Sequence, residues 1–210
     1  MKQTVLRISL CLFTLLLLLN ACTGVSVKES DSGNKDAYRN RAEKLAAISD
    51  WGFVGRISLD DGEQGGSGKL RWDVRADHSE LDFHGAMGRG AWNLTIDPDR
   101  VVLREANGME QTAADVNEVV QDRMGWLLPV GALQWWVRGL AAPGVIEDEQ
   151  FDSEGLLTSL HQFGWSVDFS RYDSRDVLAL PIRLNATRDN YRVKLAISRW
   201  HRGVNRDQPD

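Results

Sequence analysis

Several residue types are scarce in this chain of 210 residues, and each scarcity excludes a class of protein. Two cysteines are too few for a disulfide scaffold or for a cysteine-rich zinc site. Lysine and arginine (25) are outnumbered by aspartate and glutamate (30), so the chain lacks the basic surplus that is typical of a nucleic-acid-binding protein. With 42% hydrophobic and 26% charged residues the composition is globular, and the length favours one domain.

Catalytic motifs are also missing. Ser67 follows two glycines, but Lys69 stands where a nucleophile elbow needs its last glycine. The four histidines are scattered and none has the spacing of a metal-binding motif: His78, His84, His161 and His201. We therefore expect a protein that is not an enzyme and that holds no metal or cofactor.

The N-terminus has the pattern of a secretory signal. Lys2 and Arg7 precede an apolar stretch at residues 8–19, which is about the length of a signal-peptide core and short for a membrane span. The next residues, Leu-Asn-Ala-Cys ending at Cys22, resemble the lipobox of bacterial lipoproteins, although Asn20 departs from the usual small or β-branched residue. The interpretation is a signal peptide at residues 1–21 and a mature Cys22 that carries an N-palmitoyl and an S-diacylglycerol group. The alternatives are an ordinary signal cut elsewhere and an uncleaved anchor.

The mature chain divides into a short tether, one domain and a tail. Losing Lys2 and Arg7 lowers the net charge of −5 by two, to −7. Residues 22–36 are polar and without periodicity, which indicates a lipidated, flexible tether. Residues 37–203 read as a single domain, and residues 204–210 as a polar tail. Thr23 replaces the aspartate that retains lipoproteins in the inner membrane, so we expect the protein on the outer membrane, facing the periplasm.

Apolar and polar residues alternate through most of the domain, which predicts antiparallel strands with one apolar face. Residues 37–49 have helical spacing, about five strands follow between residues 53 and 103, and about four more end near residue 197. Between them, a capping box at residues 112–115 opens one helix, and residues 129–137 form a second that stops at Gly139.

These elements predict a mainly β fold, an incomplete antiparallel β-barrel whose helices cover an apolar cavity. Eight tryptophans against three tyrosines indicate large apolar surfaces to bury. The alternative is that tryptophans fill the space as a solid core.

One loop is unusual because its tip is apolar. Gly85, Gly88 and Gly90 flank Ala86 and Met87 between two alternating strands, and no polar residue caps that pair. The functional interpretation is an apolar finger that contacts membrane or ligand. The alternative is that Met87 folds back onto the domain.

The ordered set of motifs resembles the LolB family, the outer-membrane receptors of the bacterial lipoprotein-sorting pathway. The resemblance covers most of residues 51–200. It is carried by the lipobox, Trp51 with Gly-Arg-Ile at residues 55–57, Trp72, and the Gly-Ala-Met-Gly loop. Later motifs keep the family's order: Leu-Gln-Trp-Trp-Val-Arg-Gly-Leu at residues 133–140, Gly-Trp-Ser-Val at residues 164–167, and the closing strand to Trp200.

The resemblance implies a fold, partners and site residues. Such proteins have a half-barrel with a helical lid over an apolar cavity, take lipoproteins from a soluble periplasmic carrier similar to LolA, and insert them into the outer membrane without nucleotide or metal. The implied partners of this chain are that carrier, the acyl chains of client lipoproteins and outer-membrane lipid, with the chain itself a monomer. The family's loop carries an exposed apolar residue that is needed for insertion, and Met87 occupies that place.

The cavity lining is predicted from the aromatic residues of the strands and of the lid. The candidates are Trp72, Phe83, Trp92, Trp136, Trp165 and Phe169. Two other classes remain open: a structural or scaffolding outer-membrane lipoprotein with a solid core, and a lipid-modifying enzyme whose site has no recognisable motif.

Overall fold

The alternating segments form long antiparallel strands because each buries one face and exposes the other. The computed structural model describes residues 28–86, 90–124, 128–176 and 178–202. Six strands come before the central helices: β1 (Asp50–Asp60), β2 (Gly65–Arg75), β3 (His78–Gly85), β4 (Ala91–Asp97), β5 (Arg100–Glu105) and β6 (Glu110–Ala113). Five follow them: β7 (Asp148–Phe151), β8 (Leu157–Gln162), β9 (Trp165–Tyr172), β10 (Pro181–Arg188) and β11 (Tyr191–Arg202).

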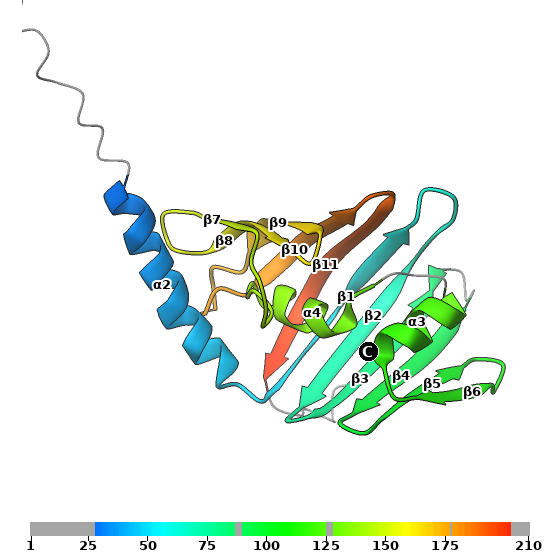
Figure 1. Cartoon of the computed structure of the whole chain (residues 1–210). Coiled ribbons are helices and arrows are strands. Elements are labelled where there is room, and N and C mark those ends of the chain that lie inside the picture. Colours follow the sequence, from blue (N-terminus) through cyan, green and yellow to red (C-terminus); the bar gives the residue numbers. More distant parts are fainter. Residues whose placement is uncertain (1–27, 87–89, 125–127, 177, 203–210) are drawn as a thin grey trace, which may run out of the picture. The chain divides into compact units, whose positions relative to one another are not determined.

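All these strands belong to one sheet in the order β6-β5-β4-β3-β2-β1-β11-β10-β9-β8-β7. Strand β1 lies in the middle, and β2 to β6 extend the sheet on one side as a meander. The second group of strands returns from the other edge, so that β11 pairs with β1 through ten registered positions, Trp51–Arg202 to Asp60–Arg192. The edges β6 and β7 do not pair with each other, so the predicted incomplete antiparallel barrel is confirmed (Figure 1).

Two short helices, α3 (Val116–Met124) and α4 (Val130–Trp136), lie over one face of this sheet (Figure 1). The Asp115 carboxylate accepts a hydrogen bond from Asn117 N at 2.6 Å and so caps α3. The predicted capping box beginning at Thr112 is therefore wrong, because Thr112 belongs to β6 and pairs with Val102. Helix α4 ends as predicted near Gly139, whose φ of 71° closes the last turn.

Helix α2 (Lys28–Ala46) begins earlier than its periodicity predicts. Residues 28–36, expected to be part of a tether, are helical. Their sequence has no apolar stripe, so its periodicity does not indicate a helix. The acidic residues Glu29 and Asp31 favour a helix N-terminus. The chain divides into two units at residues 32 and 33. In the second unit, Tyr38 and Leu45 of α2 are buried in the core.

The strands that the alternation of the sequence does not predict, β6, β7 and β8, are short or polar. Strands β6 and β7 have four residues each and lie at the edges, where each has a partner on one side. Strand β8 has buried residues three apart, Leu157 and Leu160, which does not follow a period of two. The predicted hairpin between the last two strands is confirmed, because Arg188 pairs with Tyr191 around a two-residue turn.

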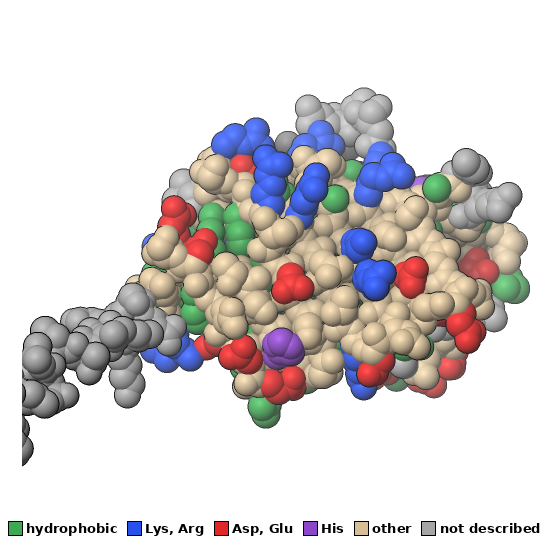
Figure 2. All heavy atoms as spheres, turned by 90° about the horizontal axis from the view of Figure 1, so that it is seen from above, with side chains coloured by type: hydrophobic (Ala, Val, Ile, Leu, Met, Phe, Trp, Pro, Cys, Tyr) green, Lys and Arg blue, Asp and Glu red, His purple; other side chains and the backbone are tan. Residues whose placement is uncertain are grey.

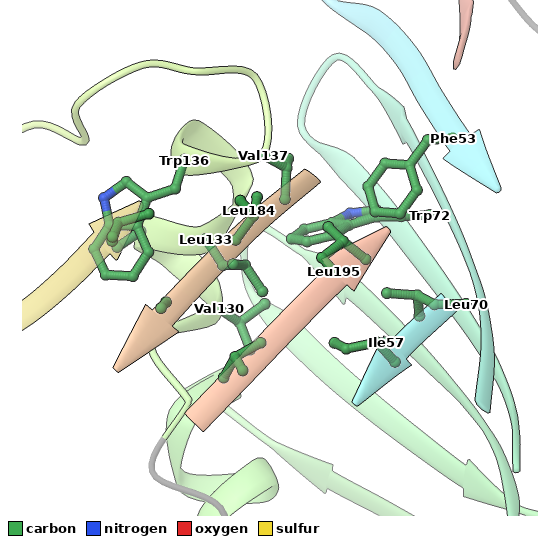
Figure 3. Packing of buried hydrophobic residues seen from close by; sticks show 14 of the residues in the cluster. Phe53, Ile57, Leu70, Trp72, Val130, Leu133, Trp136, Val137, Leu184 and Leu195 are labelled. Carbon is green, nitrogen blue, oxygen red and sulfur yellow. The ribbon is translucent and has the colours of Figure 1, made fainter. Parts of the chain in front are cut away.

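The core lies between the sheet and helix α4. Figure 3 shows Val130, Leu133 and Val137 on one side, facing sheet residues that include Ile57, Leu70, Leu184 and Leu195. The largest fully buried side chains are Trp72, Trp136 and Trp165, each at most 1% exposed. This layer is where an apolar ligand site has to be sought.

Candidate functional site

A small void lies inside the core, beneath both central helices. It measures about 20 Å³, little more than a single water molecule needs. Every side chain around it is apolar: Ile57, Leu59, Leu70, Leu81, Trp92, Leu94, Val120, Leu128, Val130 and Leu133. In the described structure this part of the core is therefore packed, and the void is too small for an acyl chain.

Leu128, two residues before the start of α4, lies between this void and a second, smaller one. The second void, about 10 Å³, is bounded by Leu59, Leu128, Trp165 and Val193, among others. Leu59 and Leu128 therefore belong to both. The predicted lining consists of aromatic residues only and does not include these leucines, although the apolar run at residues 126–130 marks this segment.

All six predicted lining aromatics face the interior, but they do not share one site. Trp92 borders the central void and stacks on Phe83, with ring centroids 5.2 Å apart. Trp165 borders the smaller void. Phe169 is buried near Tyr172, at 6.2 Å between centroids.

The other two tryptophans are fixed by hydrogen bonds. Trp72 Nε1 donates to Ser79 Oγ at 2.7 Å. Trp136 Nε1 donates to Gln162 Oε1 at 3.0 Å, and this fully buried amide also bonds the backbone N and O of Ala142. Because each of these indoles has a polar partner, both rings are held in one orientation and contribute to packing.

A larger cleft of about 540 Å³ opens at the N-terminal end of β1. Its walls are mixed, with Trp51, Trp72 and Trp135 beside polar groups. Val130 also borders the central void, so one side chain separates the cleft from the apolar interior.

Arg138 is the buried cation in this cleft. Its guanidinium carbon lies 5.1 Å from the centre of the Trp51 ring and 4.9 Å from that of Trp135. It donates hydrogen bonds to the backbone O of Leu45 and of Gln134, both at 3.2 Å. Burial lowers the pKa of Arg138 to about 10, so the side chain is charged at neutral pH. It ties the end of α4 to the last turn of α2.

Several polar side chains on the sheet lie in pairs. His161 Nε2 lies 2.7 Å from Ser166 Oγ, and Asp148 is opposite His161 in the register. His161 and Asp148 are exposed on an edge of the sheet, and the three residues line none of the cavities above. Among the described residues no cluster of three or more His, Cys, Asp or Glu side chains could hold a metal ion.

Two predicted site residues, Cys22 and Met87, lie outside the described residues. The base of the Met87 loop is described: Gly85 N donates to Gly90 O at 2.9 Å, and Gly90 has a φ of 67°. Ala86 and Gly90 are both exposed. Within the described part of the chain, no helix is long and apolar enough to cross a membrane.

The fold and its interior define a half-barrel protein built around one apolar layer, with two short helices over an open antiparallel sheet. Residues 49–200 match the family model described as outer membrane lipoprotein LolB. The chain therefore belongs to the LolB family, and the resemblance seen in the motifs is confirmed. It is an outer-membrane lipoprotein of the bacterial lipoprotein-sorting (Lol) pathway.

Relatives with the same name match nearly the whole chain. The outer-membrane lipoprotein LolB of Pseudomonas syringae pv. syringae (strain B728a) is 35% identical, over 90% of this chain and 93% of the relative. That of Pseudomonas putida (strain W619) is 36% identical over the same shares. Among solved structures, a DUF1329 family protein from Desulfovibrio piger ATCC 29098 gives a TM-score of 0.43 at 9% identity, over 85% of this chain and 95% of that one. That likeness is too weak to carry an argument.

Proposed function

We propose that this protein receives lipoproteins from a soluble periplasmic carrier similar to LolA and inserts them into the outer membrane. Their acyl chains are held between the sheet and helices α3 and α4. The observation that carries this proposal is the central void, whose ten lining side chains are all apolar. Each CH₂ group moved from water into such a lining gains about 0.8 kcal/mol.

The route into this site is opened by the helices rather than by the sheet. The sheet strands under the void are held by long ladders of backbone hydrogen bonds, such as β1 with β2 and, apart from one bulge after Val54, β1 with β11. Helices α3 and α4 have nine and seven residues and rest on apolar side chains. The hydrogen bonds that tie α4 lie at its C-terminal end, from Trp136 to Gln162 and from Arg138 to Leu45. Over the void the contacts are apolar, so separating them there breaks no directional bond, and the acyl chain replaces the contacts that are lost.

Transfer then needs no nucleotide or metal. It runs from the carrier through this protein to the bilayer if each holds the acyl chains more tightly than the one before. Cys22 carries the protein's own lipid anchor in this proposal, and Met87 makes the membrane contact that starts insertion. The protein has no catalytic role in this reaction.

A fluorescent acyl probe tests the site in the periplasmic Cys22→Ala protein, whose own anchor cannot compete for the cavity. We expect saturable binding with about one site per chain. Leu133→Ala enlarges the central void, so it should bind the probe several-fold more tightly while losing about 2–5 kcal/mol of unfolding free energy.

Leu160→Ala is the matched control, because Leu160 is equally buried but does not border the void. It should lose a similar free energy of unfolding and leave the probe affinity unchanged. The packed interior favours a second candidate, a structural lipoprotein with a solid core. Absence of saturable probe binding, both in the Cys22→Ala protein and in the same protein with Leu133→Ala, would support that candidate instead.

A further inference from the structure

The outer face of the sheet, opposite α3 and α4, carries an open groove over β1, β10 and β11. Its volume is about 600 Å³, within the range of small-molecule sites. The buried neighbours Ile57, Leu184 and Leu195 point their side chains to the core, so the residues between them face outward. Four of the lining residues are cationic and none is Asp or Glu: Arg56, Arg183, Arg192 and Lys194.

The register of the strands explains why a groove forms there. Ala196 lies between Arg56 on one side and Arg183 on the other, and its methyl group leaves the middle of that row empty. In the next row Lys194 lies between Ser58 and Asn185, both polar and short. The side chains on the floor of the groove are therefore short, and those on its walls are long and cationic.

The groove concentrates positive charge on a chain whose net charge is −5. Arg56 is directly opposite Lys69 in the register, and Arg183 is opposite Arg171. Like charges in opposite positions destabilise a sheet, so an anion between these pairs relieves a repulsion. Figure 2 shows Lys and Arg side chains gathered at one side of the molecule (blue, top), with most Asp and Glu side chains elsewhere.

The acidic residues closest by register are few. Asp60 is opposite Arg192, and Asp168 is opposite Asn185, but neither lines the groove. Among the described residues, no ion pair joins a carboxylate to any of the four lining cations. Their charge is available to a ligand.

A second observation is the amide of Asn185 in this groove. Its Oδ1 is buried and has no hydrogen-bond partner within the described part of the chain. A buried acceptor without a donor is unfavourable, and a hydroxyl or ammonium group on a bound ligand supplies the missing hydrogen bond. The site therefore suits a molecule that has an anionic group beside a hydrogen-bond donor.

We propose that this groove binds the phosphodiester headgroups of anionic glycerophospholipids, so that the outer face of the sheet makes a second contact with the membrane. Arginine and lysine are the side chains that hold phosphate, and a glycerol hydroxyl provides the donor for Asn185. The inference rests on the outer-membrane location of the protein and not on the transfer of lipoproteins. The anchor keeps the domain close to such headgroups at all times.

The test uses the lipidated protein in two sets of vesicles, phosphatidylcholine alone and phosphatidylcholine with an equal amount of phosphatidylglycerol. An amine-reactive reagent modifies exposed lysines, and mass spectrometry gives the rate at each position. Lys194 should react about fivefold more slowly in the anionic vesicles, a factor typical of one cation at an anionic surface. Lys44, exposed on α2, is the internal control and should react equally in both.

Two double variants with the same change of charge locate the effect. Arg56→Gln with Arg183→Gln should abolish the protection of Lys194, whereas Arg39→Gln with Arg104→Gln, exposed on α2 and β5, should retain it. Equal reactivity of Lys194 in both vesicles overturns the proposal, and so does equal protection of Lys44. Protection of Lys194 by inorganic phosphate in neutral vesicles, to the same extent, would show a site for free phosphate and overturn the lipid assignment.

Discussion

Asp73 is a partly buried carboxylate held by two side chains, Arg71 and His201. It accepts hydrogen bonds from Arg71 Nε and lies within hydrogen-bond distance of His201 Nε2, both at 2.6 Å, and its side chain is 15% exposed. Burial raises the pKa of Asp73, but the hydrogen bonds from Arg71 and His201 outweigh it, and the pKa lies below its ordinary value. The pair with His201 fastens the end of β11 to β2 across the start of β1.

Asp73→Asn should therefore lower the free energy of unfolding by about 1–3 kcal/mol at neutral pH. A carboxylate with a lowered pKa stabilises the fold above its unfolded pKa of about 3.9, and that contribution is lost as pH falls through the folded value. The difference between wild type and variant should shrink below about pH 4. Urea denaturation at several pH values measures it. Asp77→Asn, exposed in the nearby turn, should stay within about 0.5 kcal/mol, and an equal loss there would refute the role of Asp73.

The tryptophans show which properties of the site can be predicted from the sequence and which cannot. The inward orientation of Trp72, Trp92 and Trp165 follows from alternation along a strand, a local property. Whether such a ring lines a void or only packs depends on the helix that lies across it. Trp136 shows the difference, because its hydrogen bond to Gln162 joins residues from two distant elements.

At the scale of elements, the long strands were predictable and the edges were not. Strands β1 to β4 have enough alternating positions to indicate a period of two, and β5 is marked by the short apolar run Val101 to Leu103. Strand β6 has four residues and pairs only with β5, so its sequence carries little of that signal. The first turns of α2 were missed for the same reason, because they have no apolar stripe.

In the proposed function, the loop between β3 and β4 makes the membrane contact that starts delivery. Its base is closed by the hydrogen bond from Gly85 to Gly90, and β3 and β4 pair from Ser79–Ile96 to His84–Ala91. Met87→Glu should therefore change stability by no more than about 0.5 kcal/mol. It should accept lipoprotein from the carrier but fail to deliver it to liposomes, because a charged tip opposes contact with the bilayer.

A two-step assay separates these stages: carrier to receptor, then receptor to liposome. Met87→Leu should deliver like the wild type. A loss of several kcal/mol in Met87→Glu would mean that Met87 is a core residue, and normal delivery by that variant would mean that the loop has no role in insertion.

For the whole molecule, the two faces of the sheet have different chemistry. The inner face is apolar and covered by helices, and the outer face is polar with a cationic groove. The alternation in the sequence predicts that the faces differ. It does not place Arg56, Arg183 and Lys194 together, because that depends on the pairing of β1, β10 and β11, which are distant in the chain.

The location of the whole molecule depends on one thiol in the proposed mature chain. If Cys22 carries three acyl chains, as proposed, then about 0.8 kcal/mol per buried CH₂ makes release from the membrane negligible. The described core begins at Tyr38, sixteen residues after Cys22, so we expect Cys22→Ala to leave the fold intact. We expect the variant in the soluble periplasmic fraction with an unchanged thermal unfolding temperature. A cationic groove alone gives salt-sensitive binding, so firm retention in the outer membrane after a high-salt wash would refute the lipobox assignment.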